Sequence, residues 1–239
     1  MHPTRQDLDD YYGSRQGRLA CQRLSARVLP IIRPGSTARL LGMGHTQPLL
    51  RHLAGREFER LVMLAPFGEW SDTAGTTTGP VPATIGDPTA LPFAASVFDQ
   101  ALLLHALEFV DAATALDELW RVLAPAGEIV AVVPNRSGLW THFESTPFGY
   151  GHPYSRSTLT GLLRAARFEP VEWTTLLGSA PLQGLRWLDR PLMKLLPGFG
   201  GVHLLRARKT DGLGLQRRRV ARRAGPAAAA AAAAPRGVP

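Results

Sequence analysis

Short apolar runs alternate with amphipathic segments along most of the chain. Four of these runs lie at residues 38–44, 61–64, 99–104 and 128–133. Each is too short and too uniformly apolar to be a surface helix, so we expect buried strands there. Residues 114–123 instead repeat apolar positions at helical spacing. Strands that alternate with helices predict a parallel sheet with helices on both faces.

The N-terminal segment, residues 1–34, is predicted to be helical. Carboxylates at residues 7–10 are suited to cap a helix, and apolar side chains recur at roughly helical spacing as far as Val28. Prolines at positions 30 and 34 then end that helix. Residues 66–84, by contrast, are rich in glycine, threonine and proline, and we expect a long loop there.

The second half of the chain continues the alternation. A serine cap at position 155 or 157 predicts a helix to about residue 166, and apolar runs predict strands at residues 168–177 and 202–207. An apolar insert occupies residues 178–199. Residues 210–239 combine a basic run with eight consecutive alanines and have no apolar periodicity, so we expect a disordered tail.

The net charge of +8 at pH 7 arises near the C-terminus. Nine lysines and arginines and one aspartate lie from Arg206 onward, which leaves residues 1–205 neutral overall. The basic balance therefore says nothing about a binding face on the rest of the chain. No aromatic residue is interleaved with the tail arginines, so we expect at most a weak contact of the tail with nucleic acid or anionic lipid.

The sequence predicts a cytoplasmic protein without a metal site. Cys21 is the single cysteine, which excludes an internal disulfide and a thiolate metal cluster within one chain. No apolar run approaches the roughly 20 residues of a transmembrane helix. The first seven residues also lack the apolar core of a signal peptide.

A glycine-containing turn, Gly42-Met43-Gly44-His45-Thr46, follows the first predicted strand. In an open parallel sheet, ligands bind beyond the carboxyl ends of the strands, where the order of connections reverses. Glycine there permits a positive φ and close approach of the backbone to a ligand. By itself this turn is a weak signal, because many ordinary strand-to-helix turns contain such glycines.

A longer pattern strengthens the indication. Residues 86–140 contain an acidic turn at Gly86-Asp87, then Leu91-Pro92-Phe93, Phe98-Asp99, an apolar run, a helix ending in Trp120-Arg121-Val122-Leu123 and a second apolar run. Together with the glycine turn, this pattern resembles the type 11 group of the class I S-adenosylmethionine (SAM)-dependent methyltransferases. The resemblance covers about residues 35–177. The resemblance implies a three-layer, Rossmann-like α/β sandwich. Its sheet would be seven-stranded and mostly parallel, with an antiparallel last strand.

On this interpretation the chain has three parts. Residues 1–34 form an N-terminal helical segment that lies across a cofactor cleft. Residues 35–209 form a methyltransferase-like domain with the insert 178–199. Residues 210–239 form the basic tail.

The resemblance also implies a site for SAM. Gly44 matches the first glycine of the family's turn, which packs against the methionyl part of SAM. Asp87 matches the acidic residue whose carboxylate accepts from the adenine amino group, although a turn residue before Pro88 is an equally simple interpretation. His105 follows the fourth strand, where family members line the cofactor pocket, and also suits a capping or packing role. We assign three further residues to the same pocket: Gly42, His45 and Pro88.

Residues for the transfer itself are expected between positions 135 and 154. A sulfonium is already an activated leaving group, so the reaction needs alignment of the acceptor and a base where the acceptor holds a proton. The candidate bases are His142, Glu144 and His152. The candidate positioning groups for the substrate are Asn135, Arg136 and Tyr154. This loop leaves the sheet at its expected ligand-binding edge, although each residue also fits a solvated loop.

Two positions depart from the family pattern. Gly42 stands where the first strand usually ends in an acidic residue. Ala65 stands near the position where an Asp or Glu usually accepts from both ribose hydroxyls, and loss of such a contact costs binding free energy.

These observations support two hypotheses of function. The first is a SAM-dependent methyltransferase that acts on an unidentified small-molecule acceptor. The second is a catalytically degenerate methyltransferase fold that binds a ligand or a partner. A nicotinamide-dependent dehydrogenase is disfavoured, because the turn after the first strand lacks the third glycine of that fingerprint.

We also expect valine at Gly44 to abolish cofactor binding while leaving the fold largely intact.

Overall fold

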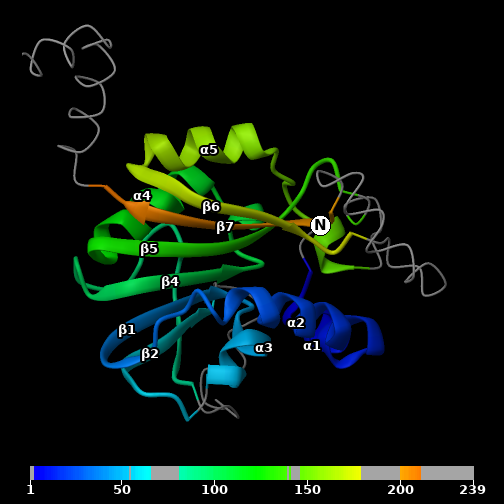
Figure 1. Ribbon diagram of the computed structural model, residues 1–239, viewed down its shortest axis with the longest axis horizontal. Coiled ribbons are helices and arrows are strands. Elements are labelled where there is room, and N and C mark those ends of the chain that lie inside the picture. Colours follow the sequence, from blue (N-terminus) through cyan, green and yellow to red (C-terminus); the bar gives the residue numbers. More distant parts are fainter. Residues whose placement is uncertain are drawn as a thin grey trace, which may run out of the picture.

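A seven-stranded sheet forms the centre of the molecule, with helices on both faces (Figure 1). The computed structural model describes residues 3–53, 55–65, 81–138, 140, 146–178 and 200–210. The strand order is β3-β2-β1-β4-β5-β7-β6, and β7 runs antiparallel to both of its neighbours while the other paired strands are parallel. The expected Rossmann-like sandwich, with a mostly parallel sheet and an antiparallel last strand, is confirmed.

The strands are β1 (Gly35–Gly44), β2 (Phe58–Ala65), β3 (Ala83–Ile85), β4 (Phe98–Leu104), β5 (Leu123–Pro134), β6 (Phe168–Leu176) and β7 (Val202–Lys209). The α-helices are α1 (Arg5–Gly13), α2 (Arg15–Val28), α3 (Gln47–Leu50), α4 (Ala112–Val122) and α5 (Arg156–Ala165). Short 3-10 helices are η1 (Arg51–Leu53), η3 (Leu107–Phe109) and η5 (Pro147–Gly149).

Side chains on the strands alternate between two hydrophobic cores. On β1, Leu41 and Met43 belong to the core beneath α4 and α5, whereas Leu40 packs with α2 and α3 on the opposite face. Successive side chains of a strand point to opposite faces, so a sheet covered on both sides requires apolar residues at every position. This requirement explains why uniformly apolar runs predicted the strands.

Two local features differ from the expected elements. The single N-terminal helix is divided into α1 and α2, because Ser14 leaves the helix and its hydroxyl accepts from the Gly17 amide to cap α2. Residues 83–85, expected to be loop, form β3 and pair with β2. A strand of three residues is too short for its periodicity to be recognised. Residues 211–239 and 179–199, which include most of the expected tail and insert, lie outside the described residues.

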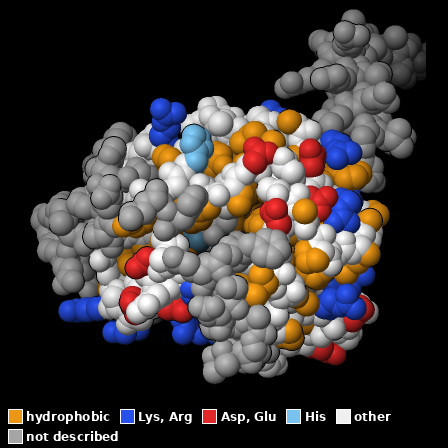
Figure 2. Space-filling model, turned by 180° about the vertical axis from the view of Figure 1, so that it is seen from behind, with side chains coloured by type: hydrophobic (Ala, Val, Ile, Leu, Met, Phe, Trp, Pro, Cys, Tyr) orange, Lys and Arg blue, Asp and Glu red, His pale blue; other side chains and the backbone are white. Residues whose placement is uncertain are grey.

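The described surface carries both signs of charge. Figure 2 shows basic and acidic side chains interspersed, with hydrophobic side chains between them. Among the described helices, none has the length and apolar character required to span a bilayer. In the same part of the chain, no three His, Cys, Asp or Glu side chains converge into a set that would hold a metal ion.

A buried carboxylate holds together the amino-terminal side of the sheet. The Glu128 side chain on β5 is inaccessible to solvent and accepts hydrogen bonds from Arg33, Arg206 and Arg208 at 2.6–3.1 Å. Burial alone would raise the pKa of this carboxyl, but the hydrogen bonds from Arg206 and Arg208 outweigh it, and the pKa lies below its ordinary value of 4.5. Glu128 thereby joins β5, β7 and the segment that precedes β1.

Replacement of Glu128 by Gln is expected to lower the free energy of unfolding by about 3 kcal/mol, because three guanidinium groups lose a buried charged acceptor. Urea unfolding at pH 7 measures the loss, with Glu57→Gln at an exposed position as the control. Because the pKa of Glu128 is lowered, its contribution is present above pH 4.5 and is lost as the pH falls below it. Equal stability of wild type and Glu128→Gln at pH 7 contradicts this role.

Candidate ligand site

The carboxyl ends of β1 and β4 meet where the strand order reverses. β2 and β3 lie on one side of β1, and β4 and β5 lie on the other. Gly44 ends β1 with a φ of 81°. A Cβ built there would lie 2.5 Å from the carbonyl oxygen of His105 and closer still to that of Leu104. A side chain at Gly44 therefore collides with the main chain that follows β4, so the fold itself requires glycine.

This geometry changes the expectation for a valine at Gly44. The larger residue separates β1 from β4 and damages the fold, so its effect on a cofactor cannot be isolated. Gly42 is also enclosed, because a Cβ there would lie 2.5 Å from Oγ1 of Thr46. Thr46 is fully buried, and its hydroxyl has no hydrogen-bond partner in the described residues. The turn thus holds an unsatisfied polar group at the edge where ligands bind in such sheets.

Helix α1 lies against this turn and brings Tyr12 to it. The Tyr12 ring stacks on His45, with ring centroids 5.4 Å apart. Its hydroxyl oxygen lies 2.9 Å from Nε2 of His105, and Nδ1 of His105 lies 3.3 Å from Oε1 of Glu108. All of these side chains are buried. Three segments of the chain, α1, the end of β4 and η3, therefore meet in one buried hydrogen-bonded chain.

Local backbone geometry sets the position of His105. Its φ is 51°, in the left-handed region that costs a non-glycine residue about 1 kcal/mol. Oε2 of Glu108 accepts from the Ala106 amide at 3.1 Å and so holds the turn that contains His105. Strained backbone that is held by specific contacts is a frequent feature of functional sites.

His45 is neutral at pH 7. Burial, with smaller contributions from nearby His105, Arg5 and Arg51, lowers its pKa to about 3. The Asp9 carboxylate lies 3.6 Å from Nε2 of His45, but it is half-exposed, and its attraction does not offset the loss of solvation. The ring therefore packs against Tyr12 as an uncharged group.

Asp87 and Pro88 form the turn that follows β3 at the same edge. The Asp87 carboxylate accepts from the amide and the hydroxyl of Thr89 at 2.7 and 2.6 Å, and these two bonds lower its pKa. It is ionised at pH 7 and partly exposed, while Pro88 is buried. Asp87 thus has the structural role of a turn residue, and its contact with adenine stays a prediction.

The predicted positioning residues after β5 have structural contacts. The Asn135 side chain donates to the Gly200 carbonyl at 2.7 Å, and the Tyr154 hydroxyl donates to the Leu107 carbonyl at 2.9 Å. Both residues are buried, whereas Arg136 is exposed. These bonds hold the loop after β5 to β7 and η3. A role of the three residues toward a substrate stays a prediction.

Of the three predicted bases, the structure describes one. The His152 amide donates to the Glu108 carbonyl at 2.8 Å, which places this residue beside the buried Tyr12–His105–Glu108 chain. His142 and Glu144 lie outside the described residues. Their catalytic roles stay predictions.

Tyr12 and Glu108 were not identified from the sequence. Tyr12 precedes His105 by 93 residues, and no local pattern connects them. Glu108 follows His105 by three residues, and this short spacing of two ionisable groups after a predicted strand is the one signal that the sequence contains.

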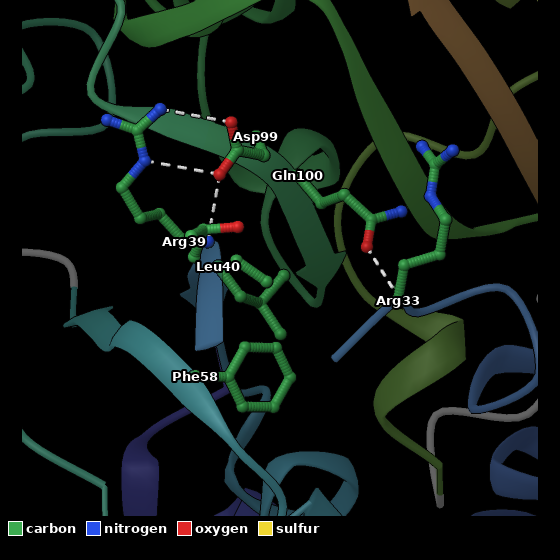
Figure 3. Close-up of a pocket in the computed structure, with 8 residues that line it drawn as sticks. Arg33, Arg39, Leu40, Phe58, Asp99 and Gln100 are labelled. Atoms are coloured by element: carbon green, nitrogen blue, oxygen red, sulfur yellow. Dashed lines mark hydrogen bonds and ion pairs between the residues drawn. The ribbon is translucent and has the colours of Figure 1, made fainter. Parts of the chain in front are cut away.

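Two described cavities lie at the opposite, amino-terminal edge. One, of about 250 Å³, is lined by Arg39, Asp99 and Gln100, among others (Figure 3). Arg39 donates to both carboxylate oxygens of Asp99, so this aspartate has a structural role. The second cavity, of about 370 Å³, lies between α2 and β6. Neither lies at the carboxyl ends of the strands, where the predicted site residues gather.

Comparison with known proteins agrees with this arrangement. Residues 41–131 match a family model described as a methyltransferase domain. A SAM-dependent methyltransferase from Thermotoga maritima, described as a possible histamine N-methyltransferase, shares 19% identity at a TM-score of 0.64, over 86% of this chain and 95% of its own. The Burkholderia thailandensis 1,6-didemethyltoxoflavin-N1-methyltransferase, solved with its acceptor and S-adenosylhomocysteine, shares 19% identity at a TM-score of 0.52, over 85% and 82%.

A third similar structure is the [4+2]-cyclase SpnF, with 21% identity and a TM-score of 0.51, over 80% of this chain and 82% of its own. No curated protein matches the chain. The family match and the shared fold confirm the resemblance that residues 86–140 indicated.

The two neighbouring tyrosines of α1 provide a matched pair of variants. Tyr12→Phe is expected to lower the free energy of unfolding by about 1–3 kcal/mol, because it leaves the buried Nε2 of His105 without its partner. Tyr11→Phe removes a buried hydroxyl that has no partner in the described residues, so its effect is expected to be near zero or stabilising. Urea unfolding of both variants tests this, and equal losses would show that the Tyr12–His105 bond contributes nothing.

His45 is expected to make the stability depend on pH. Its pKa is about 3 in the folded chain and about 6.5 when unfolded, so the unfolded state binds the extra proton as the pH falls from 6.5 toward 3. Over this range, the unfolding free energy of the wild type should fall by up to about 1.4 kcal/mol for each unit by which the pH is lowered, through this group alone. His45→Gln should show a shallower slope of unfolding free energy against pH. The pKa of His203 is also lowered by burial, but this residue is present in both proteins, so its contribution to the slope cancels in the comparison. Identical slopes contradict the prediction.

Proposed function

We propose that this chain, which has the fold of the class I SAM-dependent methyltransferases and matches their domain model over residues 41–131, transfers a methyl group from SAM to a small-molecule acceptor. The observation that carries the proposal is the Gly42–Thr46 turn. It lies at the reversal of strand order and holds a buried Thr46 hydroxyl that has no hydrogen-bond partner in the described residues.

The residues at this edge fit SAM in two places. The turn after β1 would hold the amino-acid part, through main-chain groups and the Thr46 hydroxyl. Asp87, ionised and partly exposed in the next loop, would accept from the adenine amino group. When bound, SAM supplies a methyl group on a positively charged sulfur. We place Gly44, His45, Pro88 and His105 around it as the remainder of the pocket.

The acceptor is proposed to be a small molecule. Two of the similar structures carry names that refer to small nitrogen-containing acceptors, histamine and 1,6-didemethyltoxoflavin. The loop from Asn135 to Tyr154, with His152 beside η3, would hold the acceptor at the same edge. His142 and Glu144 remain candidate bases from the same loop.

The competing proposal is a ligand-binding protein without methyl transfer. It rests on Gly42 and Ala65, which stand where family members carry acidic residues. The similarity to a [4+2]-cyclase also supports a different use of the same fold. Binding of SAM is the property that separates the two proposals.

Calorimetric titration with SAM and S-adenosylhomocysteine tests the proposal directly. We expect binding by the wild type, weakened by about 1–3 kcal/mol in Asp87→Asn through the lost charge-assisted contact. Asparagine keeps an acceptor for Thr89, so the turn is preserved. Asp117→Asn, on the exposed face of α4, is the control and should bind as the wild type does. Absence of binding at near-millimolar ligand rejects the proposal, and unchanged affinity in Asp87→Asn removes Asp87 from the site.

A further inference from the structure

The buried chain of Glu108, His105 and Tyr12 is a group of polar side chains enclosed at the carboxyl edge of the sheet. The Glu108 and His105 side chains are 1% and 0% exposed, and Tyr12 is equally enclosed. Among the described residues, the Glu108 carboxylate contacts His105 and the Ala106 amide, and it pairs with no lysine or arginine. A buried carboxylate without a cation is costly, and such groups concentrate at functional sites.

We assign the proton of a neutral His105 to Nδ1, which then donates to Glu108, because an ionised carboxylate only accepts. Nε2 is then an acceptor, and the Tyr12 hydroxyl donates to it. Burial raises the pKa of Tyr12 well above its ordinary value of 10, with smaller contributions from nearby Tyr11, Cys21 and Glu108, so the phenol keeps its proton. The phenolic oxygen retains lone pairs that can accept from a ligand.

The three side chains offer a path for one proton along two hydrogen bonds. A proton on Nε2 would convert His105 to an imidazolium whose Nδ1 lies 3.3 Å from the Glu108 carboxylate, so that the two charges would pair. Other described ionisable side chains nearby are Tyr11 and Asp9 on α1, Cys21 on α2, His45 on the turn after β1, and Tyr154 and His152 in the loop after β5.

We propose that Tyr12, His105 and Glu108 form a relay that accepts the proton released when an O–H or N–H group is methylated. The proposal rests on the proposed function. The acceptor's proton moves to the Tyr12 oxygen while the Tyr12 proton moves to Nε2 of His105. A lone pair of the acceptor atom would form the bond to the methyl carbon as the carbon–sulfur bond breaks, and the electrons of the broken bond to hydrogen would remain on the acceptor atom. The products are a neutral sulfide, the methylated acceptor and an imidazolium paired with Glu108.

The relay specifies a class of substrate. Methylation of a hydroxyl, a primary or secondary amine or a ring N–H releases a proton that needs an acceptor. Methylation of a thioether or a tertiary amine releases none, and a buried proton acceptor would have no purpose. The geometry thus points to an uncharged, protic acceptor. In this arrangement Tyr12 contacts the acceptor, His105 holds the proton and Glu108 is a positioning residue.

The first test measures the protonation of His105 in the full-length chain. Long-range ¹H–¹⁵N NMR distinguishes the two neutral tautomers, and His105→Gln assigns the signals. We expect Nδ1 to carry the proton, with Nε2 as the acceptor of a hydrogen bond. Tyr12→Phe should shift the Nε2 resonance toward that of a free imidazole nitrogen, whereas Tyr11→Phe should leave it unchanged. A proton on Nε2 of neutral His105 would overturn the relay.

The second test separates the relay from the proposed function. S-adenosylhomocysteine binding by calorimetry tests the cofactor site and should be within twofold of wild type in Tyr12→Phe, whose folding is checked by circular dichroism. Methyl transfer from labelled SAM is then measured with phenol, imidazole and aniline as protic probes, and with dimethyl sulfide as the aprotic probe. Tyr12→Phe should lower kcat for a protic probe by about 10²- to 10⁴-fold, and Tyr11→Phe should retain it.

Each outcome assigns the failure to one proposal. If the wild type does not bind S-adenosylhomocysteine, the proposed function is rejected. Two outcomes reject the relay but keep the cofactor site. In the first, the wild type binds S-adenosylhomocysteine but transfers methyl only to dimethyl sulfide. In the second, Tyr12→Phe has the same kcat as the wild type.

Discussion

The close approach of β1 to the end of β4 is the constraint on which the site depends. Gly44 has no space for a Cβ because the carbonyls of Leu104 and His105 occupy it. The same contact brings the turn after β1 next to His105, so two of the predicted cofactor segments become neighbours. Because the strand order reverses between β1 and β4, their connections diverge and leave this edge to α1 and the following loops.

Helix α1 completes the site by burial. Tyr12 packs on the neutral ring of His45 and reaches His105, which lies beside the buried Glu108 carboxylate. Electrostatic interactions are stronger in such surroundings than in water. The N-terminal segment therefore contributes a polar side chain to this buried group as well as part of its cover.

The buried and half-buried carboxylates at the two edges of the sheet have different partners. At the amino-terminal edge, Glu128 is surrounded by three arginines, and Asp99 is paired with Arg39, so these carboxylates are ionised and structural. At the carboxyl edge, the Glu108 carboxylate has the His105 imidazole as its partner instead of an arginine. The first arrangement favours stability, and the second is suited to proton transfer. The departures at Gly42 and Ala65 concern cofactor binding and leave this difference unchanged.

The sequence by itself determined six of the seven strands and the location of the glycine turn. Buried strands must be apolar on both faces, and caps such as Ser155 act on their own helix, so these features leave local signals. Only the tertiary structure decided that Tyr12, His105 and Glu108 form one chain and that Gly44 is enclosed by β4. Neither contact has a local signature, because the segments meet through strand order and burial, and the energetic effect of a buried charge depends on neighbours distant in the sequence.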